Sequence, residues 1–170
     1  MLACLDVDYR EAGGPPHAVA ACVVFDDWPA ATATAEHVET ISTIEPYVPG
    51  QLYRRELPCL LAVLERVRHP LHAIVVDGYA VLDAAGRPGL GAHLHQALDP
   101  RLPVIGVAKN FFHDSAAVEV HRGQSLRPLY VSAVGIDPQI AAAGVGRMHG
   151  PHRLPTLLKQ VDRLCRDACR

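Results

Sequence analysis

The stretch of this chain that most constrains its fold is residues 73–78, with the sequence AIVVDG. Four apolar residues, among them two β-branched valines, are typical of a strand covered on both faces of a sheet. The strand stops at Asp77, and Gly78 follows it. Because ligands of open α/β sheets bind at the carboxyl ends of the strands, Asp77 is a candidate for chemistry. The alternative is that Asp77 only starts a turn or caps a helix, as Asp-Gly pairs commonly do.

Size and composition favour a single globular domain. The chain has 170 residues, of which 49% are hydrophobic, so one domain over residues 1–170 can bury its own core. No apolar run approaches the roughly 18 residues of a membrane span. Residues 1–6 lack the basic start and the cleavage site of a signal peptide. We therefore expect a cytoplasmic protein with no membrane partner.

Cysteine usage and charge narrow the function classes. The five cysteines are an odd number and fall mostly in apolar segments, which predicts reduced thiols in the core. Cys165 and Cys169, with His149 and His152 upstream, are zinc-ligand types, but their spacing matches no common zinc site. The formal net charge of -2 argues against broad non-specific nucleic-acid binding. A nuclease whose acidic site is neutralised by divalent cations stays compatible with this charge.

Residue periodicity predicts an α/β fold with a mixed sheet flanked by helices. Strands are expected at residues 2–7, 18–25, 32–41, 73–76, 103–108, 118–120 and 129–134, and helices at residues 57–67, 90–98, 138–145 and 155–169. The first three strands are predicted to form an antiparallel meander, followed by parallel strands. The helix between the fourth and fifth strands indicates a parallel pair. Lys109 then follows the fifth strand as Asp77 ends the fourth.

Three carboxylates are candidates for one common site: Asp6 at the end of the first strand, Glu56 on the first helix, and Asp77. If the first and fourth strands are neighbours, the two aspartates lie side by side, and a helix on one face brings Glu56 over them. Clustered hard oxygen ligands suit Mg²⁺ or Mn²⁺, and such ions can hold both oxygens of phosphodiester hydrolysis. For Glu56 alone, a position in the first turn of the helix, where the dipole favours a carboxylate, is an alternative explanation.

Seven motifs resemble the endonuclease V family, in the family's order and over nearly the whole chain. They are DVDY at residues 6–9, PYVPG at 46–50 followed by Arg55 and Glu56, VDG at 76–78, GLGAHL at 89–94, PVIGVAK at 103–109, PLYVS at 128–132, and RLP at 153–155 with Asp162. The resemblance implies a ribonuclease-H-like fold. It also implies an endonuclease that uses Mg²⁺ or Mn²⁺ to cleave DNA or RNA near deaminated purines, chiefly inosine.

The resemblance also implies roles for individual residues. Asp6, Glu56 and Asp77 match the family's metal-binding acids, and Lys109 matches the lysine near the scissile phosphate. Tyr47 matches the tyrosine that wedges the strands open beside the lesion. The positions implied to contact nucleic acid around the flipped base are Pro49, Gly50, Leu52, Gly78 and Gly89. Glycine permits the close backbone approach that a flipped purine needs. A monomer is expected.

The chain departs from the family pattern at four places. Ala80 stands where the family has a second glycine, and Asp83 stands where it has a histidine. No histidine follows residues 128–132, and Asp137 is a candidate replacement as a metal ligand. No helix precedes the first strand, so the resemblance implies a divergent member that is short at its N-terminus. Two alternatives therefore stay open: a homologue with weakened catalysis that binds nucleic acid, and an enzyme for another phosphoester.

Overall fold

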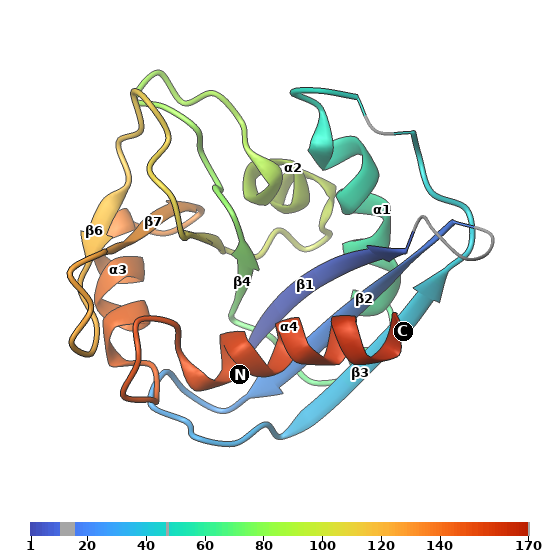
Figure 1. Ribbon diagram of the computed structural model, residues 1–170, viewed down its shortest axis with the longest axis horizontal. Helices are drawn as coiled ribbons and strands as arrows, with labels where there is room; N and C mark the ends of the chain where they lie inside the picture. The colour runs from blue at the N-terminus through green and yellow to red at the C-terminus, as the bar shows by residue number, and fades with distance from the viewer. Residues whose placement is uncertain (11–15, 47, 170) are drawn as a thin grey trace.

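The computed structural model of the protein describes residues 1–10, 16–46 and 48–169. The strands are β1 (Leu2–Arg10), β2 (His17–Phe25), β3 (Ala35–Ile41), β4 (Ala73–Asp77), β5 (Val104–Ala108), β6 (Val118–Val120) and β7 (Leu129–Val134), and the helices are α1 (Leu52–Leu64), α2 (Leu90–Ala97), α3 (Pro138–Arg147) and α4 (Thr156–Ala168). Figure 1 shows how the helices surround the sheet. The seven expected strands and four expected helices are all confirmed.

The strands form one mixed sheet in the order β3-β2-β1-β4-β5-β7-β6. The meander β1-β2-β3 is antiparallel, and β4 pairs parallel with both β1 and β5, as predicted. The parallel part ends there, because β7 runs antiparallel to β5 and to β6. A parallel return needs a long crossover, usually a helix, and the chain between β5 and β7 contains only the short strand β6.

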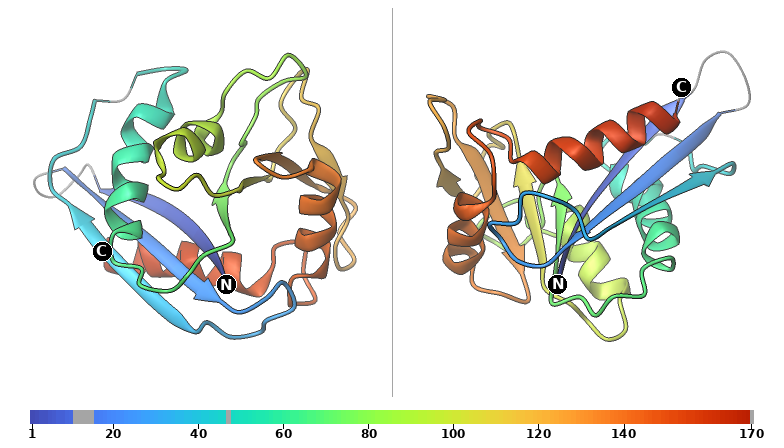
Figure 2. Two further views of the ribbon diagram at one scale, coloured as in Figure 1. Left: turned by 180° about the vertical axis from the view of Figure 1, so that it is seen from behind. Right: turned by 90° about the horizontal axis from the view of Figure 1, so that it is seen from below.

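The sheet is covered on both faces. Alternate residues of β1 enter two different cores: Leu2 and Cys4 pack with α3 and α4, whereas Ala3 and Leu5 pack with α1 and α2. The right-hand view of Figure 2 shows the sheet between these two helix pairs. All five cysteines are buried and free, as predicted. Within the three described ranges, no helix combines the length and hydropathy needed to cross a membrane.

Helix α1 begins earlier than the sequence pattern predicts. Its first residue is Leu52, and it continues through Pro58, which lies on the exposed side. Glu56 therefore falls in the second turn, and the first turn contains no acidic residue. The explanation of Glu56 by a favourable dipole in the first turn is wrong. The apolar repeat begins only at Leu57, because the first turn combines the exposed Leu52 with the buried but charged Arg55 and so has no apolar period.

Asp137 does not replace the missing family histidine. Its side chain caps α3 by accepting hydrogen bonds from the backbone N–H groups of Gln139 and Ile140. Because β7 is antiparallel to β5, Val134 at its end pairs with Val104 at the start of β5. Asp137 is thus at the edge of the sheet opposite to the one where β4 ends. The suggestion that it serves as a metal ligand is wrong.

A close crossing of backbone segments fixes the chain that leaves β4. An added Cβ on Gly106 in β5 would lie 2.2 Å from the backbone nitrogen of Ala80 and 2.6 Å from the carbonyl oxygen of Gly78. The N–H of Ala80 donates to Ser132 Oγ on β7 at 2.9 Å. Gly106 therefore lets the segment after Asp77 cross β5 in direct contact.

Substitution of Gly106 should destabilise the protein strongly. We expect Gly106→Ala to lower the free energy of unfolding by about 3 kcal/mol or more, because the Cβ would collide with backbone that cannot rotate away. Gly146→Ala in α3 is the matched control, since its Cβ would meet the nearest atom at 3.8 Å. Urea unfolding should show the control unchanged or slightly more stable. Equal stabilities of the two variants would contradict the crossing.

Candidate active site

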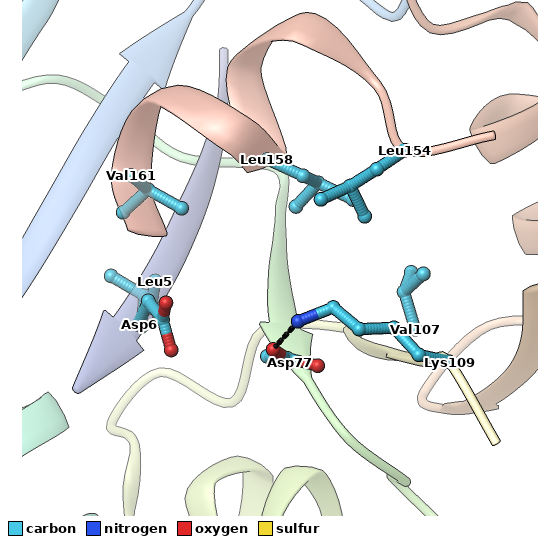
Figure 3. Close-up of a pocket in the computed structure, with 8 residues that line it drawn as sticks. All are labelled: Leu5, Asp6, Asp77, Val107, Lys109, Leu154, Leu158 and Val161. Carbon is cyan, nitrogen blue, oxygen red and sulfur yellow. Dashed lines mark hydrogen bonds and ion pairs between the residues drawn. The ribbon is translucent and has the colours of Figure 1, made fainter. Parts of the chain in front are cut away.

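Parallel pairing brings three polar side chains to one edge of the sheet. Leu5 pairs with Val76, so Asp6 on β1 and Asp77 at the end of β4 lie on adjacent strands at the same level. Lys109 follows β5, which pairs with β4 through Asp77 and Val107. Figure 3 shows the side chains of Asp6, Asp77 and Lys109 directed into one space beneath α4. We call this edge the acid edge.

Glu56 reaches the acid edge from the opposite face of the sheet. A cavity of about 180 Å³ is lined by the acidic residues Asp6, Glu56 and Asp77, and by the apolar residues Leu5, Val7, Leu60, Val76 and Leu90. Leu60 lies one turn beyond Glu56 on α1 and is buried, so packing of the helix holds Glu56 at the cavity. The structure thus brings the three predicted acids together around one space.

The environment opposes the charges of Asp6 and Glu56. Burial raises the pKa of Asp6 to about 7, and the charge of Asp77 adds to the effect. Burial likewise raises the pKa of Glu56 to about 7, with further contributions from Asp6 and Asp77. Carboxyl groups with such values stay partly protonated at neutral pH. A nearby cation would remove this penalty and draw the protons off.

Lys109 is the one predicted site residue with a positive charge. Its Nζ donates a hydrogen bond to Asp77 Oδ2 at 2.5 Å. Burial opposes the ammonium charge, but this hydrogen bond and the charges of Asp77, Asp6 and Asp162 outweigh it and raise the pKa of Lys109. Lys109 therefore stays protonated and offers donors at the acid edge.

Asp162 on α4 is a fourth carboxylate that the sequence reasoning did not assign to the site. Its charge contributes to the raised pKa values of Asp6 and Lys109, so it belongs to the same electrostatic cluster. Arg166, one turn further along α4, holds it by an ion pair of 2.8 Å between Nη2 and Oδ1. The motif match at residues 153–155 included Asp162, but only the packing of α4 over β1 reveals its proximity to Asp6.

Two arginines hold the backbone segments next to Lys109 and before α4. Arg153 donates to the backbone carbonyl of Lys109 and to that of Pro128, the latter from Nη2 at 2.7 Å. The buried Arg122 donates to the carbonyls of Met148 and His152, among others. These bonds tie the segment before α4 to the end of β5. The position of Lys109 is therefore set by the chain around residues 148–154.

The loops expected to contact nucleic acid lie at the same edge where they are described. Pro49 and Gly50 precede the N-cap residue Gln51 of α1, and Leu52 begins the helix one turn before Glu56. Gly78 follows Asp77 with a φ of 107°. Gly89 precedes α2, and its N–H donates to the carbonyl of Ala80 at 2.9 Å. The expected wedge residue, Tyr47, lies outside the described residues.

The residues present suit a hard divalent cation by their chemistry. Asp6, Glu56 and Asp77 supply carboxylate oxygens, the ligands that Mg²⁺ and Mn²⁺ prefer, and their mutual repulsion is what such an ion relieves. The three carboxylates do not form a ready set of metal ligands. In the described part of the chain, no group of three or more Asp, Glu, His or Cys side chains is arranged to hold a metal. Asp77 instead contacts Lys109.

The raised pKa values predict an unusual dependence of stability on pH. The ordinary pKa of an aspartate is near 3.8, whereas that of Asp6 in the folded protein is about 7. Between these values the folded state binds more protons than the unfolded state, so without divalent ions the free energy of unfolding should fall as the pH rises from about 4 to 7.

Asp6→Asn should remove much of this loss, because the amide keeps an oxygen to accept the N–H of Val7 but carries no charge. We expect a gain of roughly 2 to 4 kcal/mol at pH 8 in EDTA and little change at pH 4. Urea unfolding at both pH values provides the measurement, with the exposed Glu119→Gln as control. Parallel pH profiles of wild type and Asp6→Asn would refute the assignment.

Comparisons with known proteins show which family the chain resembles. The family model described as Endonuclease V matches residues 1–136. Endonuclease V of Streptomyces coelicolor is 37% identical over 175 residues, which cover 89% of this chain and 72% of that protein. The crystal structure of endonuclease V from Streptomyces avermitilis superposes with a TM-score of 0.81 at 33% identity, over 98% of this chain and 80% of that one.

A more distant structure shares the fold. Ciona intestinalis endonuclease V, in complex with DNA containing an inosine, superposes with a TM-score of 0.83 at 17% identity, over 99% of this chain and 84% of that one. These likenesses confirm the expected ribonuclease-H-like mixed sheet. With the family model matched over residues 1–136 and a relative 37% identical over most of its length, this chain belongs to the endonuclease V family and is a nuclease.

Proposed function

We propose that this nuclease hydrolyses phosphodiester bonds near inosine in DNA or RNA and depends on Mg²⁺ or Mn²⁺. The observation that carries the proposal is the gathering of Asp6, Glu56 and Asp77 around one cavity, with Lys109 beside them. The inosine-containing DNA bound by the Ciona relative supports the choice of substrate. We also propose that the protein acts as a cytoplasmic monomer.

Each residue of the acid edge has a distinct part in this proposal. Asp6, Glu56 and Asp77 would hold the divalent cation, which supplies charge neutralisation and a more acidic water. To become ligands, Asp6 and Glu56 must give up the protons that their raised pKa values favour. Lys109, kept charged by Asp77, would donate to a non-bridging oxygen of the scissile phosphate and so orient it for in-line attack.

Recognition of the base would come from the surrounding loops. Gly50 and Gly78 have positive φ values of 76° and 107°, and an added Cβ on either would meet no atom within 4 Å. Open space on the Cα side of these glycines lets a flipped purine approach the backbone closely. Leu52, which is 44% exposed, offers an apolar contact next to them. Pro49 and Gly89 flank this surface, and we propose Tyr47 as the wedge.

A homologue that binds nucleic acid but cleaves poorly is the second candidate. Asp83, at the position of a family histidine, accepts from the N–H groups of Ala85 and Arg87 and pairs with the Arg87 side chain at 3.1 Å. The Asp83 carboxylate therefore binds groups of its own loop, residues 78–88. A changed loop also favours a third candidate, an enzyme for a different phosphoester.

Removal of one acid tests the nuclease proposal. Asp77→Asn should slow cleavage of a labelled inosine-containing oligonucleotide in Mg²⁺ or Mn²⁺ by about a thousandfold or more, because a charged ligand is lost. Asp137→Asn is the matched control, since asparagine caps a helix as well as aspartate and Asp137 is at the opposite edge of the sheet.

The control variant should cleave like the wild type. Full activity of Asp77→Asn would overturn the assignment of the acid edge. If the wild type binds an inosine oligonucleotide tightly but does not cleave it in Mg²⁺ or Mn²⁺, the result favours the second candidate, a homologue that binds nucleic acid and cleaves poorly. Cleavage of a small phosphodiester but of no oligonucleotide would favour the third.

A further inference from the structure

We propose that Phe111 and Tyr130 form a stacking platform for an unpaired base of the substrate strand, on the side of the acid edge away from α1. The inference rests on the proposed function, because it assumes that a nucleic-acid strand crosses the acid edge. Neither residue is among those that the motifs imply to contact the flipped base or the cleaved phosphate. The platform would therefore bind a different nucleotide of the same strand.

The sheet topology places these rings beside the reactive centre. Phe111 is two residues beyond Lys109, and Tyr130 at the start of β7 pairs with Ala108 at the end of β5. In the strand order, β1 and β7 are separated by β4 and β5. At the usual strand spacing, β7 is about 14 Å from β1. A strand that reaches from the α1 side past Lys109 would meet the platform a few nucleotides away.

The rings of Phe111 and Tyr130 are held in place by contact with each other and by hydrogen bonds to the neighbouring backbone. Their centroids lie 5.5 Å apart with planes inclined by 60°, an edge-to-face arrangement. The Tyr79 hydroxyl donates to the carbonyl of Asn110 at 2.9 Å and accepts from the N–H of Phe112 at 3.0 Å. These bonds clamp the backbone on both sides of Phe111. The Phe111 ring is thus held against Tyr130 while 60% of the residue stays exposed.

Apolar exposure is concentrated at this edge of the protein. The large hydrophobic residues that are exposed in the described ranges are Val38, Val48, Leu52, Phe111, Phe112, Leu126 and Ile140. Five of them are on segments beside the acid edge, namely the residues before and at the start of α1, those after β5, and the turn that leads into β7. Of these five, Phe111 and Phe112 are adjacent in the chain, so they expose two aromatic rings shortly after Lys109.

The neighbouring charges favour a nucleic acid as the occupant. Lys109 precedes Phe111 by two residues, and the Arg87 guanidinium lies 5.5 Å from the centre of the Phe112 ring. Both cations are in ion pairs, with Asp77 and Asp83, yet their side chains stay 41% and 57% exposed and accessible to a phosphate. Cations next to exposed aromatic rings are the usual means of holding single-stranded nucleic acid, because phosphates pair with the cations and bases stack on the rings. Stacking requires an unpaired base, so the platform would favour single-stranded or frayed substrates and would tolerate any base.

Oligonucleotide binding in EDTA, which separates affinity from cleavage, tests the platform. The probes are two labelled single strands, one with inosine and one without. We expect Phe111→Ala to weaken binding of both about tenfold, Phe111→Leu to weaken it similarly, and Phe111→Trp to retain it. Ile140→Ala is the matched control, because Ile140 is 62% exposed but lies at the opposite edge. Thermal unfolding verifies that each variant is folded.

A fluorescent base locates the contact. 2-Aminopurine placed at successive positions beside the inosine should be quenched at one position by the wild type and at none by Phe111→Ala. Wild-type affinity of Phe111→Ala or Phe111→Leu, or no binding of either strand by the wild type, would overturn the platform. If the wild type does not cleave at inosine but Phe111→Ala still loses binding, the proposed substrate is overturned and the platform stands.

Discussion

Parallel pairing of β1, β4 and β5 is the constraint on which the rest of this structure depends. It brings the ends of three buried strands to one edge, so Asp6, Asp77 and Lys109 meet although they are far apart in the chain. The covered strands cannot shift register without moving every side chain to the wrong face. The geometry of the acid edge is therefore a consequence of the hydrophobic pattern of the strands.

The acid edge is maintained against its own electrostatic cost. Burial and mutual repulsion disfavour the charged forms of Asp6 and Glu56, and the surrounding packing holds them in place nonetheless. Gly106 lets the chain beyond Asp77 pass in contact with β5, and Arg153 ties the backbone of Lys109 to residues before α4. Sites that oppose the stability of the fold in this way are typical of catalysis.

The local sequence predicts most of the sheet, because apolar runs such as residues 73–76 are short, β-branched and followed by a turn former, which favours a buried strand over a helix. It did not predict the start of α1, since exposed residues such as Leu52 carry no periodic signal. Asp137 was misplaced because the direction of β7 depends on a connection without a helix. Asp162 and Phe111 became candidates only in three dimensions, where α4 crosses β1 and Tyr79 clamps the chain after Lys109.

The most direct test of the central claim, that a divalent cation relieves the buried acids, is calorimetric titration of Mn²⁺ into the wild-type protein in buffers of different ionisation enthalpy. With pKa values of about 7 for Asp6 and Glu56, binding at pH 7 should release about one proton per protein molecule and at pH 9 nearly none. Binding without proton release at pH 7, or no binding at either pH, would contradict the account.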